Sequence, residues 1–165
     1  MAETFAPDRL SADKALRYAE VRVEIASVLD GEPDRVARMA TVASMLKHSF
    51  DHYFWSGFYV VDPDKPDELM VGPYQGTLGC LRIAFGRGVC GAAASSRRTQ
   101  IVEDVHAFPG HIACDGRSLS EIVVPVLDAH GRLIAVFDVD ATQLAAFDEI
   151  DAVGIERILK DVFAG

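Results

Sequence analysis

The feature that most constrains this fold is a pair of largely apolar runs separated by a short turn. The runs are Glu121–Leu127 and Arg132–Asp140, and the segment Asp128–Gly131 between them has turn-forming residues. This arrangement predicts a β-hairpin. Successive side chains of a strand point to opposite faces of a sheet, so Asp138 and Asp140 must share one face. The hairpin therefore has an acidic face and an apolar face.

Helical patterns lie towards both ends of the chain. Apolar residues recurring every three to four positions predict helices at about residues 11–28, 33–48 and 147–163, with Ser11 capping the first. The expected buried faces carry Leu16, Ala19, Val23 and Ala26 in the first helix, and Ile155, Ile158, Leu159 and Val162 in the last. A helical layer packed on a sheet is the arrangement that these segments favour.

Strand patterns fill the middle of the chain. Residues 53–61 are rich in aromatic and β-branched side chains, which favour strands, and residues 68–71 are expected to pair with them. Residues 72–80 are predicted to be a glycine-rich loop, and 89–96 a short helix of small residues. Antiparallel strands between terminal helices predict an α+β fold, and 165 residues is the usual size of a single domain, here 1–165.

Composition excludes several classes of partner. The formal net charge is −9 at pH 7, which disfavours binding to nucleic acid or to an anionic membrane surface. The first residues lack the basic and apolar regions of a signal peptide, and no apolar run approaches the roughly 20 residues that span a bilayer. A cytoplasmic protein is therefore expected, in a compartment that keeps thiols reduced.

All three cysteines of the chain, Cys80, Cys90 and Cys114, lie within one segment of 35 residues. Their spacing matches no standard zinc motif, and their odd number disfavours a static disulfide framework. Thiol redox chemistry, in which one thiolate is oxidised and a second thiol condenses with it, is one interpretation. The alternative is that these cysteines are small buried apolar residues.

Two further groups of residues favour a binding pocket. If the hairpin strands are neighbours, Glu121, Asp138 and Asp140 converge on one wall, where they could bind an ammonium group or donate a proton. Trp55 and Tyr59 share a strand face and could wall a site for a thioether. A solvated acidic face and ordinary core packing are the respective alternatives.

The long connection between Glu103 and Ser120 has no clear periodicity. Connections of that length inside a compact domain are usually functional or disordered. This one carries Cys114 together with His106 and His111, so we expect it to fold over the sheet as a site loop; neither histidine is assigned a role.

Seven segments together resemble one known family. They are WSGFY, VGPYQG, GCLRI, GRGVCG, EDVHAFPGHIACD, SLSEIVVPV and FDVD, within about residues 53–140. The combination is similar to free methionine-(R)-sulfoxide reductases, which have a GAF fold. The resemblance implies a central antiparallel sheet, with the N- and C-terminal helices on one face and the site loop over the other.

The resemblance also implies a role for each candidate residue. Cys114 matches the cysteine that attacks the sulfoxide sulfur, Cys80 the one that closes a disulfide with it, and Cys90 a third cysteine that relays the disulfide or substitutes as the nucleophile. The carboxylates that hold the ammonium and the sulfoxide oxygen match Glu121, Asp138 and Asp140, and the pocket aromatics match Trp55 and Tyr59. Glu121 is expected to be the general acid.

The expected reaction is the reduction of free methionine (R)-sulfoxide, with thioredoxin or another dithiol as reductant and no metal or organic cofactor. GAF domains often form homodimers, so a homodimer is a further implication. Two other interpretations of the chain stay open: a GAF sensor module that binds a small ligand, and a metal-binding or thiol-buffering protein.

Overall fold

One six-stranded sheet organises the molecule. The computed structural model describes residues 4–165. The strands have the order β3-β2-β1-β6-β5-β4, and every neighbouring pair is antiparallel. In chain order the elements are η1 (Pro7–Arg9), α1 (Lys14–Val28), α2 (Arg35–Ser49), β1 (Trp55–Asp62), β2 (Lys65–Gln75), β3 (Arg82–Ala84), α3 (Gly88–Ser96), β4 (Gln100–Val102), η2 (Val105–Ala107), β5 (Ser120–Leu127), β6 (Leu133–Ala141) and α4 (Glu149–Phe163). The predicted α+β class is confirmed.

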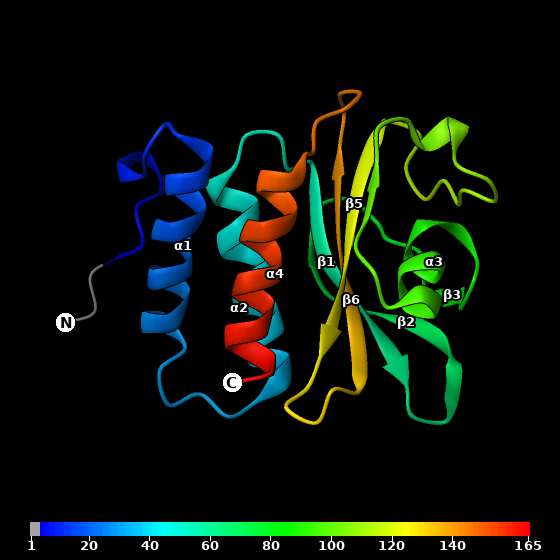
Figure 1. Cartoon of the computed structure of the whole chain (residues 1–165), viewed down its shortest axis with the longest axis horizontal. Coiled ribbons are helices and arrows are strands. Elements are labelled where there is room, and N and C mark those ends of the chain that lie inside the picture. The colour runs from blue at the N-terminus through cyan, green and yellow to red at the C-terminus, as the bar shows by residue number, and fades with distance from the viewer. Residues whose placement is uncertain (1–3) are drawn as a thin grey trace.

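The two faces of the sheet are covered differently. Figure 1 shows α1, α2 and α4 together on one side of the sheet, while α3 and the connection around η2 lie on the other side. Terminal helices on one face and an irregular segment over the opposite face are the arrangement that the sequence predicts. The long connection contains one short 3-10 helix, η2, and is otherwise irregular.

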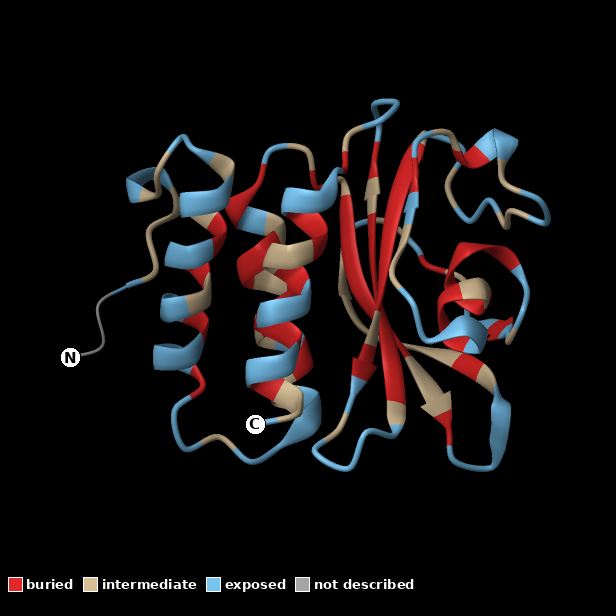
Figure 2. Ribbon diagram, viewed as in Figure 1, coloured by how far each residue is buried: buried red, intermediate tan, exposed pale blue. Residues whose placement is uncertain are grey.

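A large apolar core fills the space between the three long helices and the sheet. Phe58 and Phe137 are fully buried there, with ring centroids 4.8 Å apart. Figure 2 shows buried residues along the sheet-facing sides of the helices and along the central strands. The predicted stripe of α4 is confirmed, because Ile155, Ile158, Leu159 and Val162 are all buried. Each such side chain contributes on the order of 2 kcal/mol through burial.

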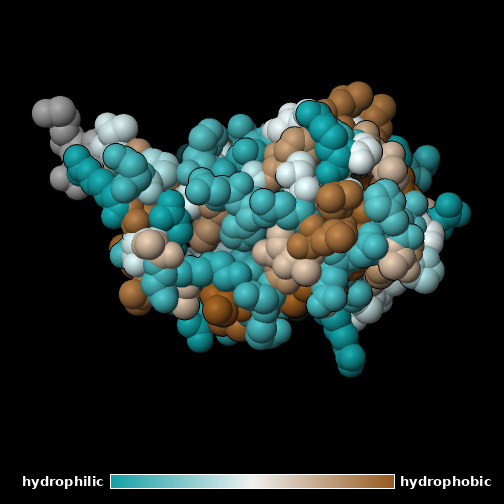
Figure 3. Space-filling model, turned by 90° about the horizontal axis from the view of Figure 1, so that it is seen from above, coloured by the Kyte–Doolittle hydropathy of each residue, from teal (hydrophilic) through white to brown (hydrophobic). Residues whose placement is uncertain are grey.

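The face of α1 that packs on the core differs from the predicted one. The helix buries Tyr18, Val21 and Ile25. The predicted residues are all exposed: Leu16, Ala19, Val23 and Ala26. Tyr18 turns inward because its hydroxyl finds partners there, at 2.7 Å from both the Tyr53 hydroxyl and Asp151 Oδ1. A polar group can be buried when it is hydrogen-bonded, and sequence periodicity does not show such partners. Figure 3 shows hydrophobic side chains in separate patches among hydrophilic ones across the face that it draws.

Two element boundaries also differ from the predicted ones. The side chain of Asp13, rather than Ser11, caps α1 by accepting a hydrogen bond from the Leu16 backbone N–H at 2.9 Å. Strand β2 continues to Gln75, through part of the segment predicted to be a loop, because β1 pairs with it along that length. Strand pairing thus extends a glycine-containing segment that local propensity disfavours.

Among the residues that the structure describes, no helix is both long and apolar enough to cross a membrane.

Candidate active site

A second cluster of buried apolar side chains lies on the sheet face opposite the long helices, and it surrounds a pocket. The pocket is lined by Phe54, Trp55, Tyr59, Leu78, Gly79, Ile83, Arg87, Gly88, Val89, Cys90, His111, Ile112, Ala113, Cys114, Asp115, Ser118, Glu121, Asp138 and Asp140. Seven of the eight candidate residues from the sequence are in this lining. The eighth, Cys80, reaches the pocket through a disulfide.

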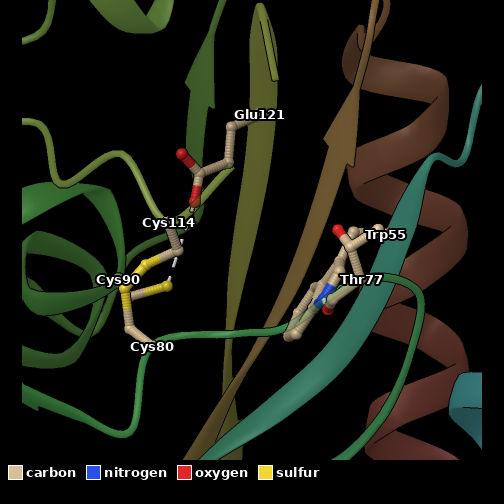
Figure 4. Close-up of a disulfide and its surroundings, with 6 residues drawn as sticks. All are labelled: Trp55, Thr77, Cys80, Cys90, Cys114 and Glu121. Carbon is tan, nitrogen blue, oxygen red and sulfur yellow. Dashed lines mark hydrogen bonds between the residues drawn. A yellow bond between two sulfur atoms is a disulfide. The ribbon is translucent and has the colours of Figure 1, made fainter. Parts of the chain in front are cut away.

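That disulfide joins Cys80 to Cys114 (Figure 4), with Cα atoms 5.6 Å apart and a sequence separation of 34. The structure therefore contains the pairing that the family resemblance implies. Cys114 is exposed and Cys80 is partly buried. The bond ties the loop before β3 to the long connection before β5, and an external reductant could reach the Cys114 sulfur from solvent.

Cys90 has a different environment. It is buried in the first turn of α3 and is outside the disulfide, and its Sγ lies 3.9 Å from Glu121 Oε1 (Figure 4). Burial, followed by the nearby charges of Asp138 and Glu121, raises the pKa of the Cys90 thiol well above its ordinary value. A thiolate is the reactive form of cysteine, so Cys90 is poorly placed to be a nucleophile while these acids surround it.

The three acids converge because of strand register. Glu121 on β5 is the direct partner of Asp140 on β6, and Asp138 is the partner of Gly57 on β1. The face alternation predicted for β6 is confirmed, since Phe137 packs in the helix-side core while Asp138 and Asp140 line the pocket.

Burial raises the pKa values of these acids. The pKa of Glu121 lies well above its ordinary value because the group is buried and because Asp138 and Asp140 are close. Burial raises the pKa of Asp138 to about 6, and hydrogen bonds from Glu121 and Cys90 limit that rise. The arrangement therefore favours a proton on Glu121 over a proton on Asp138. A neutral carboxyl and a carboxylate can act as a proton donor and a cation ligand, respectively.

One acceptor in the pocket has no partner. Among the described residues, the buried oxygen Asp138 Oδ1 makes no hydrogen bond. Leaving such an atom unpaired is costly, so it is suited to a donor that arrives from outside. Donor atoms of Cys90, Glu121 and Asp138 lie within 4.8 Å of one another and could also hold a metal ion. An ammonium group in the pocket could bind to the same carboxylates.

The aromatic wall of the pocket is formed by Trp55 and Tyr59. Trp55 stacks with Tyr59 and also with Tyr74 outside the lining, with centroids 5.7 and 5.0 Å away and planes inclined by 18° and 21°. The Trp55 indole N–H donates to the Thr77 carbonyl oxygen at 2.8 Å. Gly76 has φ +131°, and a Cβ there would lie 2.6 Å from the Trp55 ring. The glycine therefore allows the loop to cross directly over the indole.

Several pocket residues were not identified from the sequence. Ser118 is buried and hydrogen-bonds to Asp140, which tends to lower the pKa of that acid, although burial and the charge of Asp138 raise it overall. Asp115, next to Cys114, also lines the pocket. Single polar residues in a loop give no periodic signal. His111 does line the pocket, whereas His106 is not among the lining residues.

Comparisons with known proteins agree with this geometry. The GAF-domain family matches residues 36–162. A free methionine-R-sulfoxide reductase of Saccharomyces cerevisiae is 41% identical over 79% of this chain and 75% of its own, and one of Escherichia coli is 37% identical over 86% and 84%.

A solved structure is also similar. The free methionine-R-sulfoxide reductase of Neisseria meningitidis, in complex with its substrate, has a TM-score of 0.88 and 49% identity, and the match covers 93% of this chain and 91% of that one. The pocket has an acidic wall with a disulfide beside it, and these relatives match most of the chain. The chain therefore belongs to the GAF-domain family of free methionine-R-sulfoxide reductases.

Proposed function

We propose that this protein reduces free methionine (R)-sulfoxide to methionine with its own thiols. The observation that carries the proposal is the Cys80–Cys114 disulfide beside a pocket in which Glu121 and Asp138 are buried. A disulfide that borders an acidic pocket has both parts that the reaction needs: an oxidisable pair of thiols and a proton donor.

Substrate binding would use the carboxylates and the aromatic stack. The ammonium group of a free amino acid would donate to Asp138 Oδ1, the buried acceptor that has no partner among the described residues. The side chain would lie against Trp55 and Tyr59, since sulfur and methyl groups contact aromatic rings favourably. A peptide-bound residue has no free ammonium, so Asp138 would stay unpaired and binding would be weaker.

In the first chemical step the Cys114 thiolate attacks the sulfoxide sulfur while the Glu121 carboxyl protonates the sulfoxide oxygen. The S–O bond then breaks, the oxygen passes to the Cys114 sulfur as a sulfenic acid, and methionine leaves with sulfur reduced by two electrons. Glu121 is suited to this role because burial and the neighbouring acids raise its pKa, which favours the protonated form.

In the second step the Cys80 thiol attacks the sulfenic sulfur, the disulfide forms, and water leaves. A dithiol then reduces the disulfide and becomes a disulfide itself. We assign this last role to thioredoxin or a similar reductant, because Cys114 is exposed and because cytoplasmic conditions keep such a bond transient. A cytoplasmic location and a homodimer stay predictions; sedimentation velocity would test the homodimer.

The direct test is to incubate purified protein with each epimer of free methionine sulfoxide and dithiothreitol and to measure methionine release. The R epimer should be consumed and the S epimer left, and N-acetylmethionine sulfoxide should react poorly because it lacks the ammonium. Release of methionine from neither epimer would refute the proposal. Binding of a small ligand without turnover would instead support a sensor module.

A further inference from the structure

A hydrogen bond connects the same two loops as the disulfide. The Thr77 hydroxyl donates to Asp115 Oδ2 at 2.7 Å. Thr77 lies three residues before Cys80, and Asp115 directly follows Cys114. The Cys80 and Cys114 loops are thus joined twice, once by a covalent bond that opens on reduction and once by a hydrogen bond that involves no thiol.

The Thr77 side of this contact is fixed to the sheet. Its carbonyl oxygen accepts the hydrogen bond from the Trp55 indole, and Figure 4 shows Thr77 against Trp55, with the chain running from there to Cys80. Trp55 is itself held between two tyrosine rings at the start of β1. Thr77 is therefore held in place independently of the disulfide.

The Asp115 side is held by Arg117, two residues further along the same loop. Arg117 donates to Asp115 from its backbone N–H at 2.9 Å and from its guanidinium at 3.0 and 2.8 Å. That guanidinium lies over the Phe54 ring, 4.9 Å from its centroid. Hydrogen bonds from Arg117 and Thr77 hold the pKa of Asp115 well below its ordinary value, so the acceptor stays charged. Hydrogen bonds to a charged acceptor are stronger than neutral ones.

We propose that the Thr77–Asp115 hydrogen bond is a clasp that keeps Cys80 within reach of Cys114 while the disulfide is open. Both partners are positioning residues: they touch no reacting atom and act by raising the effective concentration of one thiol at the other. The inference that the clasp speeds disulfide closure during turnover rests on the proposed function. The inference that the clasp favours the disulfide at equilibrium does not rest on it.

The thermodynamic test is to equilibrate the protein with mixtures of reduced and oxidised dithiothreitol and to count free thiols by alkylation and mass spectrometry. The equilibrium is protein dithiol plus oxidised dithiothreitol, giving protein disulfide plus reduced dithiothreitol. Thr77→Val, which removes the hydroxyl and keeps the shape, should lower the equilibrium constant about tenfold, close to 30 mV in reduction potential. Thr77→Ser, which keeps the hydroxyl, should stay near wild type.

A double-mutant cycle assigns the effect to this contact. Once Asp115 is replaced by Ala, Thr77→Val should cause little further loss, because both changes remove one interaction. An equal equilibrium constant for Thr77→Val and wild type would overturn the clasp. So would additive losses in the cycle. The reduced variants should still melt in one cooperative transition, which separates loss of the clasp from loss of the fold.

The kinetic test follows a single turnover of reduced protein with one equivalent of substrate. Thr77→Val should release the first methionine at the wild-type rate but close the disulfide about tenfold more slowly, so that dimedone traps more Cys114 sulfenic acid. Equal trapping in Thr77→Val, Thr77→Ser and wild type would refute the kinetic role. Absence of any methionine release would instead refute the proposed function and leave the equilibrium result standing.

Discussion

Cys80 and Cys114 are joined in a disulfide, although 34 positions separate them in the sequence, and their Cα atoms lie 5.6 Å apart. The two residues have unequal surroundings, because Cys114 is exposed at the mouth of the pocket whereas Cys80 is partly buried. Because of this difference in exposure, Cys114 is the attacking cysteine in the proposed reaction and Cys80 is the one that closes the disulfide.

Serine substitutions test these roles. Cys114→Ser should abolish methionine release, because no other cysteine is exposed at the pocket and the buried Cys90 stays protonated. Cys80→Ser should release one methionine per chain and then stop without thiols in solution, with Cys114 as the sulfenic acid. The measurements are methionine yield per chain and the mass of the trapped cysteine. Full activity in Cys114→Ser would contradict the assignment.

Glu121→Gln tests the proton donor. The amide keeps the shape but cannot protonate the sulfoxide oxygen, so kcat/KM should fall by about 10²-fold or more. The raised pKa of Glu121 means that the active, protonated form persists to higher pH than in an ordinary glutamate and is lost as pH rises through that pKa. Rates between pH 6 and 10 should therefore decline on the alkaline side in wild type, and this dependence on Glu121 should be missing in the variant. An unchanged rate in Glu121→Gln would exclude the role.

Asp138→Asn should stabilise the fold while it weakens substrate binding. Its pKa is about 6 in the folded protein, above the ordinary value of 3.8. The folded state thus holds a proton more tightly than the unfolded state, and stability falls as pH rises from about 4 through 6. At pH 8 the variant should gain on the order of 2 kcal/mol in free energy of unfolding, and at pH 3.5 much less. Urea unfolding at both pH values measures this, and a variant that is less stable at pH 8 would refute it.

Asp151 should behave in the opposite way. It is buried, caps the start of α4, and accepts hydrogen bonds from Tyr18, Lys14 and His52. These partners outweigh the effect of burial and hold its pKa well below the ordinary value. Its contribution to stability is therefore present above about pH 4 and lost as pH falls below that value.

Asp151→Ala should lower the free energy of unfolding at pH 7 by about 3 kcal/mol, because it leaves several buried donors without an acceptor. The loss should shrink as the pH approaches 2, and thermal melting across that range measures it. Asp161→Ala is the control on the same helix, since Asp161 is exposed and, among the described residues, forms one ion pair, with the partly exposed Arg22. A pair of that kind contributes at most about 1 kcal/mol. Equal losses in both variants would contradict the assigned role of Asp151.

Local chemistry in the sequence determined much of the scaffold. Period-two alternation placed Asp138 and Asp140 on one strand face and Phe137 on the other, and helical periodicity placed Ile155 and its neighbours in the core. Both follow from backbone geometry that is repeated along the chain. The pairing of Cys80 with Cys114 did not follow from spacing; it came from the resemblance to a family, and the structure contains it.

Tertiary structure alone decided the rest. The chain turns Tyr18 rather than Leu16 into the core because Asp151, 133 residues away, supplies a partner for its hydroxyl. The contact between Thr77 and Asp115 likewise depends on two loops that meet only after the sheet has formed. Periodicity reports which side chains share a face of one element. Which partner lies opposite that face depends on contacts between distant segments, and no local pattern encodes them.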